Sequence, residues 1–271
     1  MEILGIIAGN GAYPIELAQR ARAAGVKRIV VTAFENETSP ELASLVDEIA
    51  WMRVGQLGKM IGFFEKSGVR EAIMAGQIAP KNLFDLRPDF KALLLLGRLK
   101  ERNAESLFGG IADELKKSGV TLLSATTFFE DSLAPAGHFA GSPLKKRTIA
   151  DLEYGFRIAK EVSRLDIGQT VVVRNGTVLA VEAFEGTNDA IQRGGAMGKG
   201  GAVMVKVSKP NQDFRFDVPV IGRQTLETAQ AAGIIAIGVE AGCTLLLERA
   251  ELLADAATRK IALFGIEAST G

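Results

Sequence analysis

The sequence predicts an α/β protein with two domains, the first built on a parallel sheet and the second on a mixed sheet. Short apolar, strand-like runs alternate with helical patterns from the start of the chain to about residue 130. Such alternation is typical of βαβ units, in which the strands of one sheet run parallel. The second half departs from this alternation and contains a hairpin pattern, which indicates a mixed fold. We therefore expect domains at 1–135 and 148–271, joined by a linker at 136–147.

The first domain is expected to be Rossmann-like, because most of its apolar strands are followed by helices. Gly25 marks the end of the first helix, since glycine is common just past a helix C-terminus. The predicted strands cover residues 3–8, 28–32, 48–52, 72–75 and 120–123. The predicted helices cover residues 13–24, 56–67, 88–100 and 104–117.

The second domain is predicted from turn patterns and shorter apolar runs. Asn175-Gly176 separates apolar runs at 170–174 and 177–182, and this dipeptide favours the type I′ turn of a hairpin. A glycine-rich stretch at 194–201 lacks the Gly-Lys-Ser/Thr sequence of a phosphate loop, so we expect a mobile loop that folds over a ligand. The other expected elements are helices from about 148 and at 223–232 and 249–257, and strands at 203–207, 234–239, 243–247 and 261–264.

Composition excludes several classes of function. Lys and Arg together number 32, as do Asp and Glu, so no excess of positive charge favours a nucleic-acid partner. The single cysteine, Cys243, allows no disulfide framework within the chain and fits a reducing cytoplasm. The single histidine, His138, excludes the usual zinc clusters, so any metal is expected to be a hard cation bound by oxygen. The apolar runs are shorter than the roughly 20 residues of a membrane-spanning helix.

The leucine-rich segment at 90–99 leaves two interpretations open. Its basic neighbours, Lys91, Arg98, Lys100 and Arg102, permit contact with a lipid surface. Burial in the core is favoured over lipid contact, because a leucine-rich helix of ordinary length is usually buried.

Two glycine loops follow predicted strands of the first domain. Gly9-Asn10-Gly11 comes directly after the first strand, where backbone amides can approach a phosphate at the next helix N-terminus. Gly76-Gln77 follows the strand at 72–75 and is expected at the same edge of the sheet. Pro14 replaces the third glycine of the dinucleotide fingerprint, which weakens the case for a redox cofactor. A tight turn that binds nothing and an NAD(P)-dependent sugar-nucleotide oxidoreductase remain alternatives.

Polar residues are densest in the second half of the chain. Glu185 and Asp189 can hold a hard divalent cation or position a water molecule. Lys206, Lys209 and Arg215 can neutralise phosphate oxygens, so the mixture suits chemistry on a diphosphate. Asp217 stands between Phe216 and the apolar run at 218–220, where an acid costs free energy unless it has a partner or a task.

These motifs resemble the LpxI family of UDP-2,3-diacylglucosamine diphosphatases over nearly the whole chain. The resemblance is carried by the opening glycine loop through Pro14, Gly58-Lys59, Gly76-Gln77, the run at 164–169, Glu185-Gly186-Thr187 and the run at 209–222. It implies a magnesium-dependent hydrolase that splits the UDP-sugar into UMP and 2,3-diacylglucosamine 1-phosphate, a step of lipid A synthesis. It also implies a cytoplasmic location with transient contact to the inner membrane surface.

The resemblance extends to individual residues. It implies Asp217 as the essential carboxylate, in agreement with the argument from its apolar neighbours. We expect Asp217 either to bind Mg²⁺ or to orient the attacking water, and Glu185 and Asp189 to be further ligands of Mg²⁺. Asn188 replaces an aspartate that the family commonly has at this position, which puts a metal or substrate contact of that aspartate in doubt. A non-catalytic sugar-nucleotide-binding protein remains an alternative, and a homodimer is one of the open oligomeric states. The predicted substrate-binding residues are Gly9, Asn10, Gly11, Gly76, Gln77, Thr187, Asn188, Lys206, Lys209 and Arg215.

Overall fold

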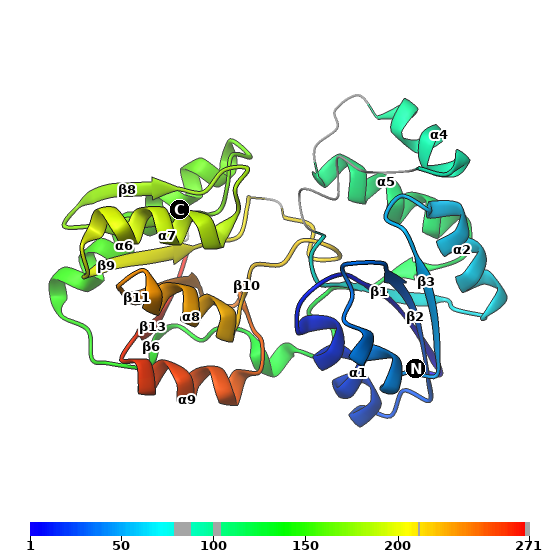
Figure 1. The fold of residues 1–271 in the computed structure, drawn as a ribbon, viewed down its shortest axis with the longest axis horizontal. Helices are drawn as coiled ribbons and strands as arrows, with labels where there is room; N and C mark the ends of the chain where they lie inside the picture. Colours follow the sequence, from blue (N-terminus) through cyan, green and yellow to red (C-terminus); the bar gives the residue numbers. More distant parts are fainter. Residues whose placement is uncertain (79–87, 100–103, 211, 269–271) are drawn as a thin grey trace. The chain divides into compact units, whose positions relative to one another are not determined.

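The computed structural model describes residues 1–78, 88–99, 104–210 and 212–268. The chain divides into two compact units (Figure 1). The first unit comprises Met1–Phe128 and Asp213–Asp217, and the second comprises Phe129–Gln212 and Val218–Gly271. This division differs from the predicted domains at 1–135 and 148–271 in two ways. Residues 129–147 belong to the second unit, and the five residues Asp213–Asp217, which were predicted to lie in the second domain, belong to the first unit.

The first unit is built on a parallel sheet with the strand order β3-β2-β1-β4-β5, which confirms the predicted fold class. Its strands are β1 (Ile3–Ala8), β2 (Arg28–Phe34), β3 (Glu48–Met52), β4 (Glu71–Ala75) and β5 (Thr121–Leu122). Its helices are α1 (Tyr13–Ala23), η1 (Pro40–Ser44), α2 (Leu57–Lys66), α4 (Phe90–Arg98) and α5 (Ala104–Lys117). Residue 100 of the predicted helix 88–100 lies outside the described residues.

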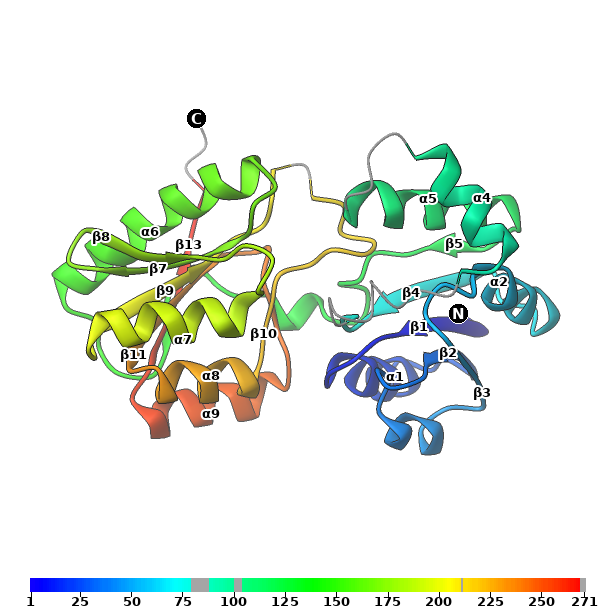
Figure 2. The same cartoon turned by 45° about the horizontal axis from the view of Figure 1, so that its top comes forward.

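Helices cover both faces of this sheet, with α1 on one face and α2, α4 and α5 on the other (Figure 2). The second of these faces packs a core that includes Ile7, Val30, Phe64 and Leu115. Strands buried on both faces have nearly continuous apolar runs, which explains why β1 and β2 were predictable from sequence. The chain runs from β1 outward to β2 and β3 on one side of β1, and then crosses to β4 and β5 on the other side, so the strand order reverses at β1. Ligands of open α/β sheets bind at such a switch point.

The second unit has a mixed sheet with the strand order β6-β13-β11-β9-β7-β8. Strands β9, β11 and β13 run parallel, whereas β6, β7 and β8 pair antiparallel with their neighbours. These strands are β6 (Gly137–Ala140), β7 (Thr170–Arg174), β8 (Thr177–Val181), β9 (Ala202–Lys206), β11 (Ile234–Glu240) and β13 (Ala262–Ile266), and a small parallel pair is formed by β10 (Val220–Ile221) and β12 (Leu245–Leu246).

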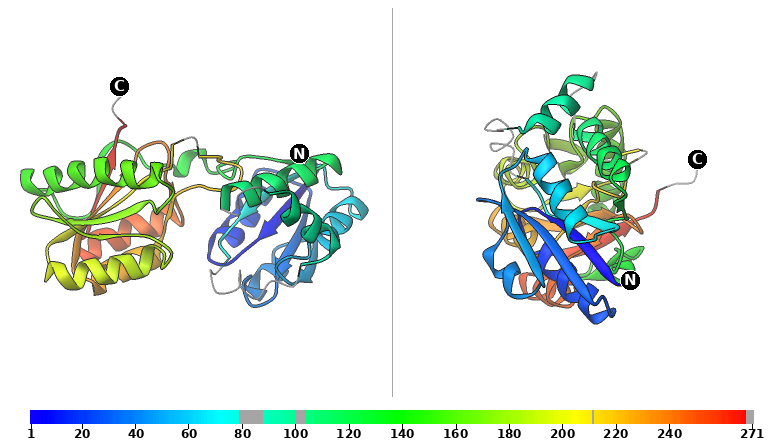
Figure 3. Two further views of the ribbon diagram at one scale, coloured as in Figure 1. Left: turned by 90° about the horizontal axis from the view of Figure 1, so that it is seen from above. Right: turned by 90° about the vertical axis from the view of Figure 1, so that its right-hand side faces the viewer.

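Helix α6 (Lys146–Arg164) lies on one face of the larger sheet. Helices α7 (Thr187–Gly198), α8 (Arg223–Ala231) and α9 (Arg249–Arg259) lie on the other face, and the short helix η2 is Glu130–Ser132 (Figures 2 and 3). The predicted hairpin is confirmed. Asn175 and Gly176 have φ values of 52° and 72°, as a type I′ turn requires. The buried carboxylate of Asp151 accepts the amides of both turn residues, at 2.8 and 2.7 Å.

The linker expected at 136–147 is wrong for much of its length. Strand β6 falls inside it and pairs with β13, and α6 begins at Lys146. Proline and glycine here shape an edge strand rather than a connection between domains. Gly265 shows how tightly the chain packs at this point, because a Cβ on it would lie 1.8 Å from the Pro135 carbonyl oxygen.

The mobile loop expected at 194–201 is also wrong, because residues up to Gly198 form the second half of α7. The glycines of this helix allow it to approach its neighbours closely. A Cβ on Gly194 would lie 2.5 Å from Val172 of β7, and one on Gly195 would lie 2.2 Å from the Ala232 carbonyl oxygen. Close packing of the helix therefore offsets the low helix propensity of glycine.

Candidate functional site

Two glycine loops meet at the carboxyl edge of the first sheet, where β1 and β4 end side by side. Asn10 and Gln77 form an antiparallel bridge, in which the Asn10 amide donates to the Gln77 carbonyl over 2.7 Å and the Gln77 amide donates to the Asn10 carbonyl over 3.2 Å. The Gly9 amide donates to the Ala75 carbonyl over 2.8 Å. The structure thus brings the predicted residues of both loops together at the switch point of the sheet.

Glycine is required at both positions 9 and 76 by this close approach. A Cβ on Gly9 would lie 2.5 Å from the Gln77 carbonyl oxygen, and one on Gly76, which has φ +91°, would lie 2.5 Å from the Asn10 carbonyl oxygen. The amides of Gly9, Asn10 and Gln77 donate to main-chain carbonyls, so these three amides are not free to bind a phosphate as predicted. Asn10, Gly11, Gly76 and Gln77 are exposed at this edge, and the side chains of Asn10 and Gln77 are accessible polar groups there.

The segment Asp213–Asp217 carries Asp217 into the first unit. The Phe214 carbonyl accepts the Ala125 amide over 2.7 Å, and the Phe216 ring lies 5.6 Å from the Phe108 ring of α5. The Asp217 amide donates to the Asp213 carbonyl over 3.1 Å, which closes a turn. Asp217 is partly exposed, so the expectation of an acid enclosed by apolar neighbours is not met.

Arg215 is held by an acid of the same turn. Its Nε donates to both Asp213 carboxylate oxygens, at 2.9 and 3.0 Å, and its Nη2 donates to Oδ2 at 2.5 Å. The hydrogen bonds from Arg215 hold the pKa of Asp213 below its usual range, and the same contact raises the pKa of Arg215. Part of the positive charge predicted for phosphate binding is therefore neutralised by Asp213.

A buried lysine ends strand β9 of the second unit. Lys206 is 4% exposed, and its Nζ donates to Thr187 Oγ1 over 3.3 Å and to the Val220 carbonyl over 3.2 Å. Thr187 Oγ1 donates in turn to Glu182 Oε1 over 2.8 Å. Since a buried cation is costly without polar neighbours, this arrangement links the predicted residues Lys206 and Thr187 with Glu182, which was not among the predicted site residues.

The N-terminus of α7 lies at the same place, because Thr187 is its first residue. Gly186 precedes it with φ +87°, a conformation that favours glycine. The first amides of a helix and its dipole favour anions, and here they stand beside the ammonium group of Lys206. Asn188 follows as a half-buried residue, whereas Asp189 is exposed.

Both carboxylate oxygens of Glu185 have partners within the second unit. One carboxylate oxygen pairs with Arg193 of α7, and the other accepts the Ala183 amide over 3.1 Å. The hydrogen bond from Arg193 lowers the pKa of Glu185. Both oxygens of a predicted metal ligand are therefore already in use.

The predicted magnesium ligands do not form a cluster within either unit. Asp217 belongs to the first unit, and Glu185 and Asp189 belong to the second. In the part of the chain that the structure describes, no three His, Cys, Asp or Glu side chains are grouped so that they could hold a metal ion. A cage made of protein groups alone does not fit this donor set. Magnesium commonly takes one or two carboxylates together with substrate phosphates, and Asp217 fits that arrangement.

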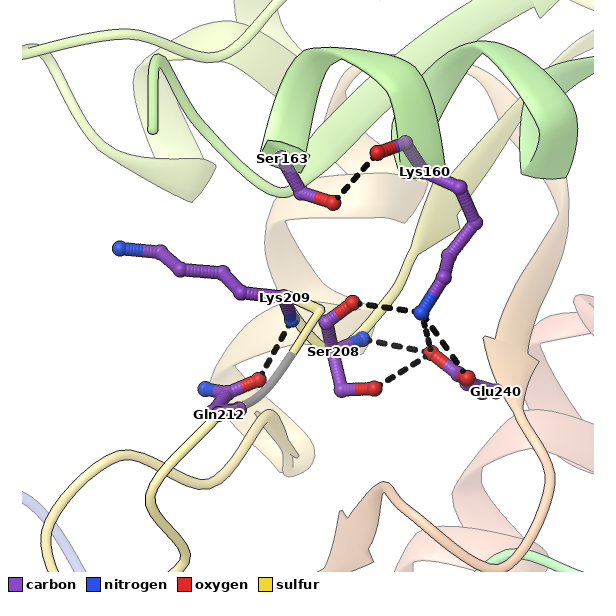
Figure 4. A network of polar contacts seen from close by, with 6 residues as sticks. All are labelled: Lys160, Ser163, Ser208, Lys209, Gln212 and Glu240. Atoms are coloured by element: carbon purple, nitrogen blue, oxygen red, sulfur yellow. Dashed lines mark hydrogen bonds and ion pairs between the residues drawn. The ribbon is translucent and has the colours of Figure 1, made fainter. Parts of the chain in front are cut away.

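A second buried network lies at the end of β11 (Figure 4). Glu240 accepts Lys160 Nζ at 3.1 and 3.0 Å, and its Oε2 also accepts the Ser208 amide at 2.8 Å and the Ser208 hydroxyl at 2.7 Å. Lys160 donates further to the Ser208 carbonyl over 2.8 Å. The network therefore fixes the chain immediately after Lys206. Sequence reasoning missed it, although an acid directly after the apolar strand 234–239 was a usable signal.

The predicted residue Lys209 follows this network. Its Nζ donates to Asp166 Oδ1 over 2.5 Å, and its amide donates to Gln212 Oε1 over 2.6 Å. Asp166 has φ +55° and lies in the run at 164–169 that carried part of the family resemblance. The structure therefore joins two of the sequence motifs through one ion pair.

Comparison with known proteins identifies both halves of the chain. Residues 3–132 match the LpxI N-terminal domain, and residues 135–264 match the LpxI C-terminal domain. The UDP-2,3-diacylglucosamine pyrophosphatase LpxI of Caulobacter vibrioides is 31% identical over 278 residues, covering 98% of each chain.

Solved structures give weaker similarities. The biotin carboxylase domain of Hydrogenobacter thermophilus 2-oxoglutarate carboxylase is 13% identical with a TM-score of 0.29, over 64% of this chain and 35% of that chain. The biotin carboxylase subunit of pyruvate carboxylase is 13% identical with a TM-score of 0.28, over 68% of this chain and 39% of that chain. This chain thus spans less than half of either carboxylase chain, and similarity at this level carries no inference about it.

Proposed function

This chain belongs to the LpxI family, and from that membership we propose that it hydrolyses UDP-2,3-diacylglucosamine to UMP and 2,3-diacylglucosamine 1-phosphate. The observation that carries the proposal is the end-to-end match to a relative named as a pyrophosphatase of this substrate. In the reaction, water forms a new bond to one phosphorus, and the bridging phosphorus–oxygen bond breaks. This step belongs to lipid A synthesis.

We assign Asp217 as the catalytic carboxylate. It is partly exposed at the end of a turn that hydrogen bonds and an aromatic contact hold on the first unit. A carboxylate in such a position can accept a proton from the attacking water or orient that water. The turn fixes its main chain without burying the reacting group.

We assign phosphate binding to Lys206 and the N-terminus of α7. The lysine is buried and placed by Thr187 and Val220, so its charge is held in one position. A fixed cation and aligned amides stabilise negative charge on phosphate oxygens without reorganising during the reaction. Asn10 and Gln77 of the first unit, with Gly11 and Gly76 beside them, remain proposed contacts of the nucleotide part, as do Asn188 and Lys209 for the substrate as a whole.

Magnesium is part of the proposal as the cofactor that offsets charge on the phosphate oxygens when it is bound. Asp217 is its proposed protein ligand. Glu185 is the weakest of the predicted ligands, because both its oxygens already have partners. Asp189 remains an exposed candidate on α7.

The proposed location is the cytoplasm at the inner membrane surface, because the substrate carries two acyl chains. Over the described ranges, no helix is both long and apolar enough to cross a membrane. The association that we propose with that surface is peripheral.

One incubation tests the function. The purified chain is mixed with UDP-2,3-diacylglucosamine, with Mg²⁺ or with EDTA, and the products are identified by mass. We expect equal amounts of UMP and the sugar 1-phosphate, with Mg²⁺ only. Tight substrate binding without UMP release would indicate the non-catalytic alternative, and nicotinamide-dependent oxidation would indicate an oxidoreductase. Equally fast hydrolysis in EDTA would refute the magnesium requirement alone.

A further inference from the structure

Helix α4 exposes a continuous apolar face. Phe90, Leu93 and Leu94 are 76%, 54% and 44% exposed, and Phe90 is the most exposed of the large apolar side chains that the structure describes. Their spacing of three and four residues places them on one side of the helix. The other side carries Ala92 and Leu95, which are buried in the core of the first unit. The core-packing interpretation of this segment therefore accounts for only half of the helix.

Positive charge borders this apolar face. Lys91 lies three residues before Leu94 and Arg98 lies four residues after it, so both flank Leu94 on the helix surface. Lys91, Arg98 and Lys117 approach the single carboxylate of Glu114 at 3.9, 3.7 and 2.6 Å. One acid serves three cations, which leaves an excess of positive charge at the edge of the apolar patch.

Scattered exposed leucines need no explanation, because much of any protein surface is apolar. Three large apolar side chains on one face with a cationic border are a different pattern, typical of helices that lie in a membrane interface. The face is small, since it offers three side chains on a helix of nine residues. Contact through it would therefore be reversible, as for a single lipid anchor.

We propose that this face of α4 docks on an anionic lipid bilayer, with Phe90, Leu93 and Leu94 entering the interface and Lys91 and Arg98 contacting headgroup phosphates. The choice of a bilayer rests on the proposed function, because a diacylated substrate resides in a membrane. Apolar burial and attraction to anionic headgroups act together in this geometry. Docking would hold the enzyme at the surface that contains its substrate.

Vesicle co-sedimentation tests the proposal. The wild-type chain should bind vesicles that contain phosphatidylglycerol more tightly than vesicles of phosphatidylcholine alone. The double variant Leu93→Glu/Leu94→Glu should lower the affinity for vesicles at least about tenfold, because it removes two leucine side chains that would be buried in the bilayer on binding. Ile235→Glu is the matched control, since Ile235 is 42% exposed on β11 of the second unit and receives the same acid. It should bind as the wild type does.

Milder variants keep the test valid if the double variant misfolds. Lys91→Gln/Arg98→Gln should lower binding to anionic vesicles on the order of twentyfold and leave neutral vesicles unaffected. Phe90→Ala should lower binding to both vesicle types about threefold. Energy transfer from Trp51, the single tryptophan, to a dansyl lipid gives a second readout from the first unit.

Three results would overturn the proposal. The first is a wild-type chain that does not bind anionic vesicles, and the second is α4 variants that bind these vesicles as tightly as Ile235→Glu does. The third is a wild-type dimer that the α4 substitutions dissociate while vesicle binding stays unchanged. The last result would assign the face to a second copy of the chain. Hydrolysis of substrate in detergent micelles is measured in parallel and should be unchanged in the α4 variants. Vesicle binding without any hydrolysis would refute the proposed function and leave the docking surface standing.

Discussion

The carboxyl edges of the two sheets are built from different polar groups. At the first sheet, the loops after β1 and β4 are joined by main-chain hydrogen bonds between Asn10 and Gln77. At the second sheet, the neighbouring parallel strands β9 and β11 end in buried charged side chains, Lys206 and Glu240, each 4% exposed. One edge is a rigid main-chain surface, and the other holds fixed charges.

This difference suggests different roles in substrate binding and catalysis for the two sheet edges. Buried charges are costly to fold around, and removing one partner of a buried pair is more costly still. A protein that keeps two such networks at one sheet edge is expected to use them. The first edge has a fixed main chain and exposed polar side chains instead of buried charges. Asp217 is part of the first unit because the segment Asp213–Asp217 belongs to that unit, whereas the residues on either side of it belong to the second.

The largest effect is expected from Glu240→Ala. The substitution leaves the partly exposed ammonium group of Lys160 and the buried amide and hydroxyl of Ser208 without their carboxylate, which should cost about 3 kcal/mol of unfolding free energy. Urea unfolding followed by circular dichroism measures this. Glu227→Ala is the control, because that exposed acid pairs with Arg259 at 3.7 Å and should cost under about 1 kcal/mol. Equal costs for the two variants would show that the second edge does not depend on its buried charge.

The next effect concerns Lys206. Lys206→Met keeps a long side chain but removes the fixed cation, so kcat/KM should fall on the order of 100-fold to 1,000-fold. Steady-state kinetics with the UDP-sugar measures the loss. Lys199→Met, at an exposed lysine just after α7, should leave the kinetics unchanged. An active Lys206→Met enzyme would mean that the buried lysine serves folding only.

The rigidity of the first edge can be tested with a pair of glycines. Gly76→Ala should destabilise the first unit by about 3 kcal/mol, because the new Cβ meets the Asn10 carbonyl oxygen and φ is positive. Gly11 has φ +96° but open space around a Cβ, so Gly11→Ala should cost only about 1 kcal/mol. Thermal unfolding compares the two variants. Similar losses would show that the contact between the two loops adds little.

The smallest effect is a pH dependence in the segment that carries Asp217. The pKa of Asp213 is lowered in the folded state by Arg215, so the stability from this pair is present above the unfolded pKa of about 4. It is lost as the pH falls through the lowered folded value. The pair is partly exposed, so Asp213→Asn should cost at most about 1 kcal/mol at pH 7. Urea unfolding measures the difference in unfolding free energy between wild type and variant, which should shrink as the pH is lowered from 7. A difference that does not change with pH would exclude the Asp213–Arg215 pair as its source.

Local patterns in the sequence were sufficient for much of the fold. The apolar strands β1 and β2, the glycine loops and the Asn175-Gly176 turn are each encoded within a few neighbouring residues. Asp217 could be singled out only because an acid stood in an apolar run and the family resemblance agreed.

The features that sequence missed depend on distant residues. Strand β6 exists because β13 pairs with it from the far end of the chain, and α7 tolerates its glycines because Val172 and Ala232 pack against them. The bond between Lys160 and Glu240 joins residues 80 positions apart. The placement of Asp213–Asp217 on the first unit depends on Ala125 and Phe108, and no periodicity or turn pattern reports such contacts.

The most direct test of the central claim is the turnover of Asp217→Ala with UDP-2,3-diacylglucosamine. The variant should fold and bind substrate as the wild type does, while kcat falls at least about 1,000-fold, because the reacting carboxylate is gone. Asp213→Ala, which removes an acid from the same turn, should keep at least about a tenth of the activity, because a half-exposed ion pair contributes little. Near wild-type turnover by Asp217→Ala would contradict the assignment of Asp217.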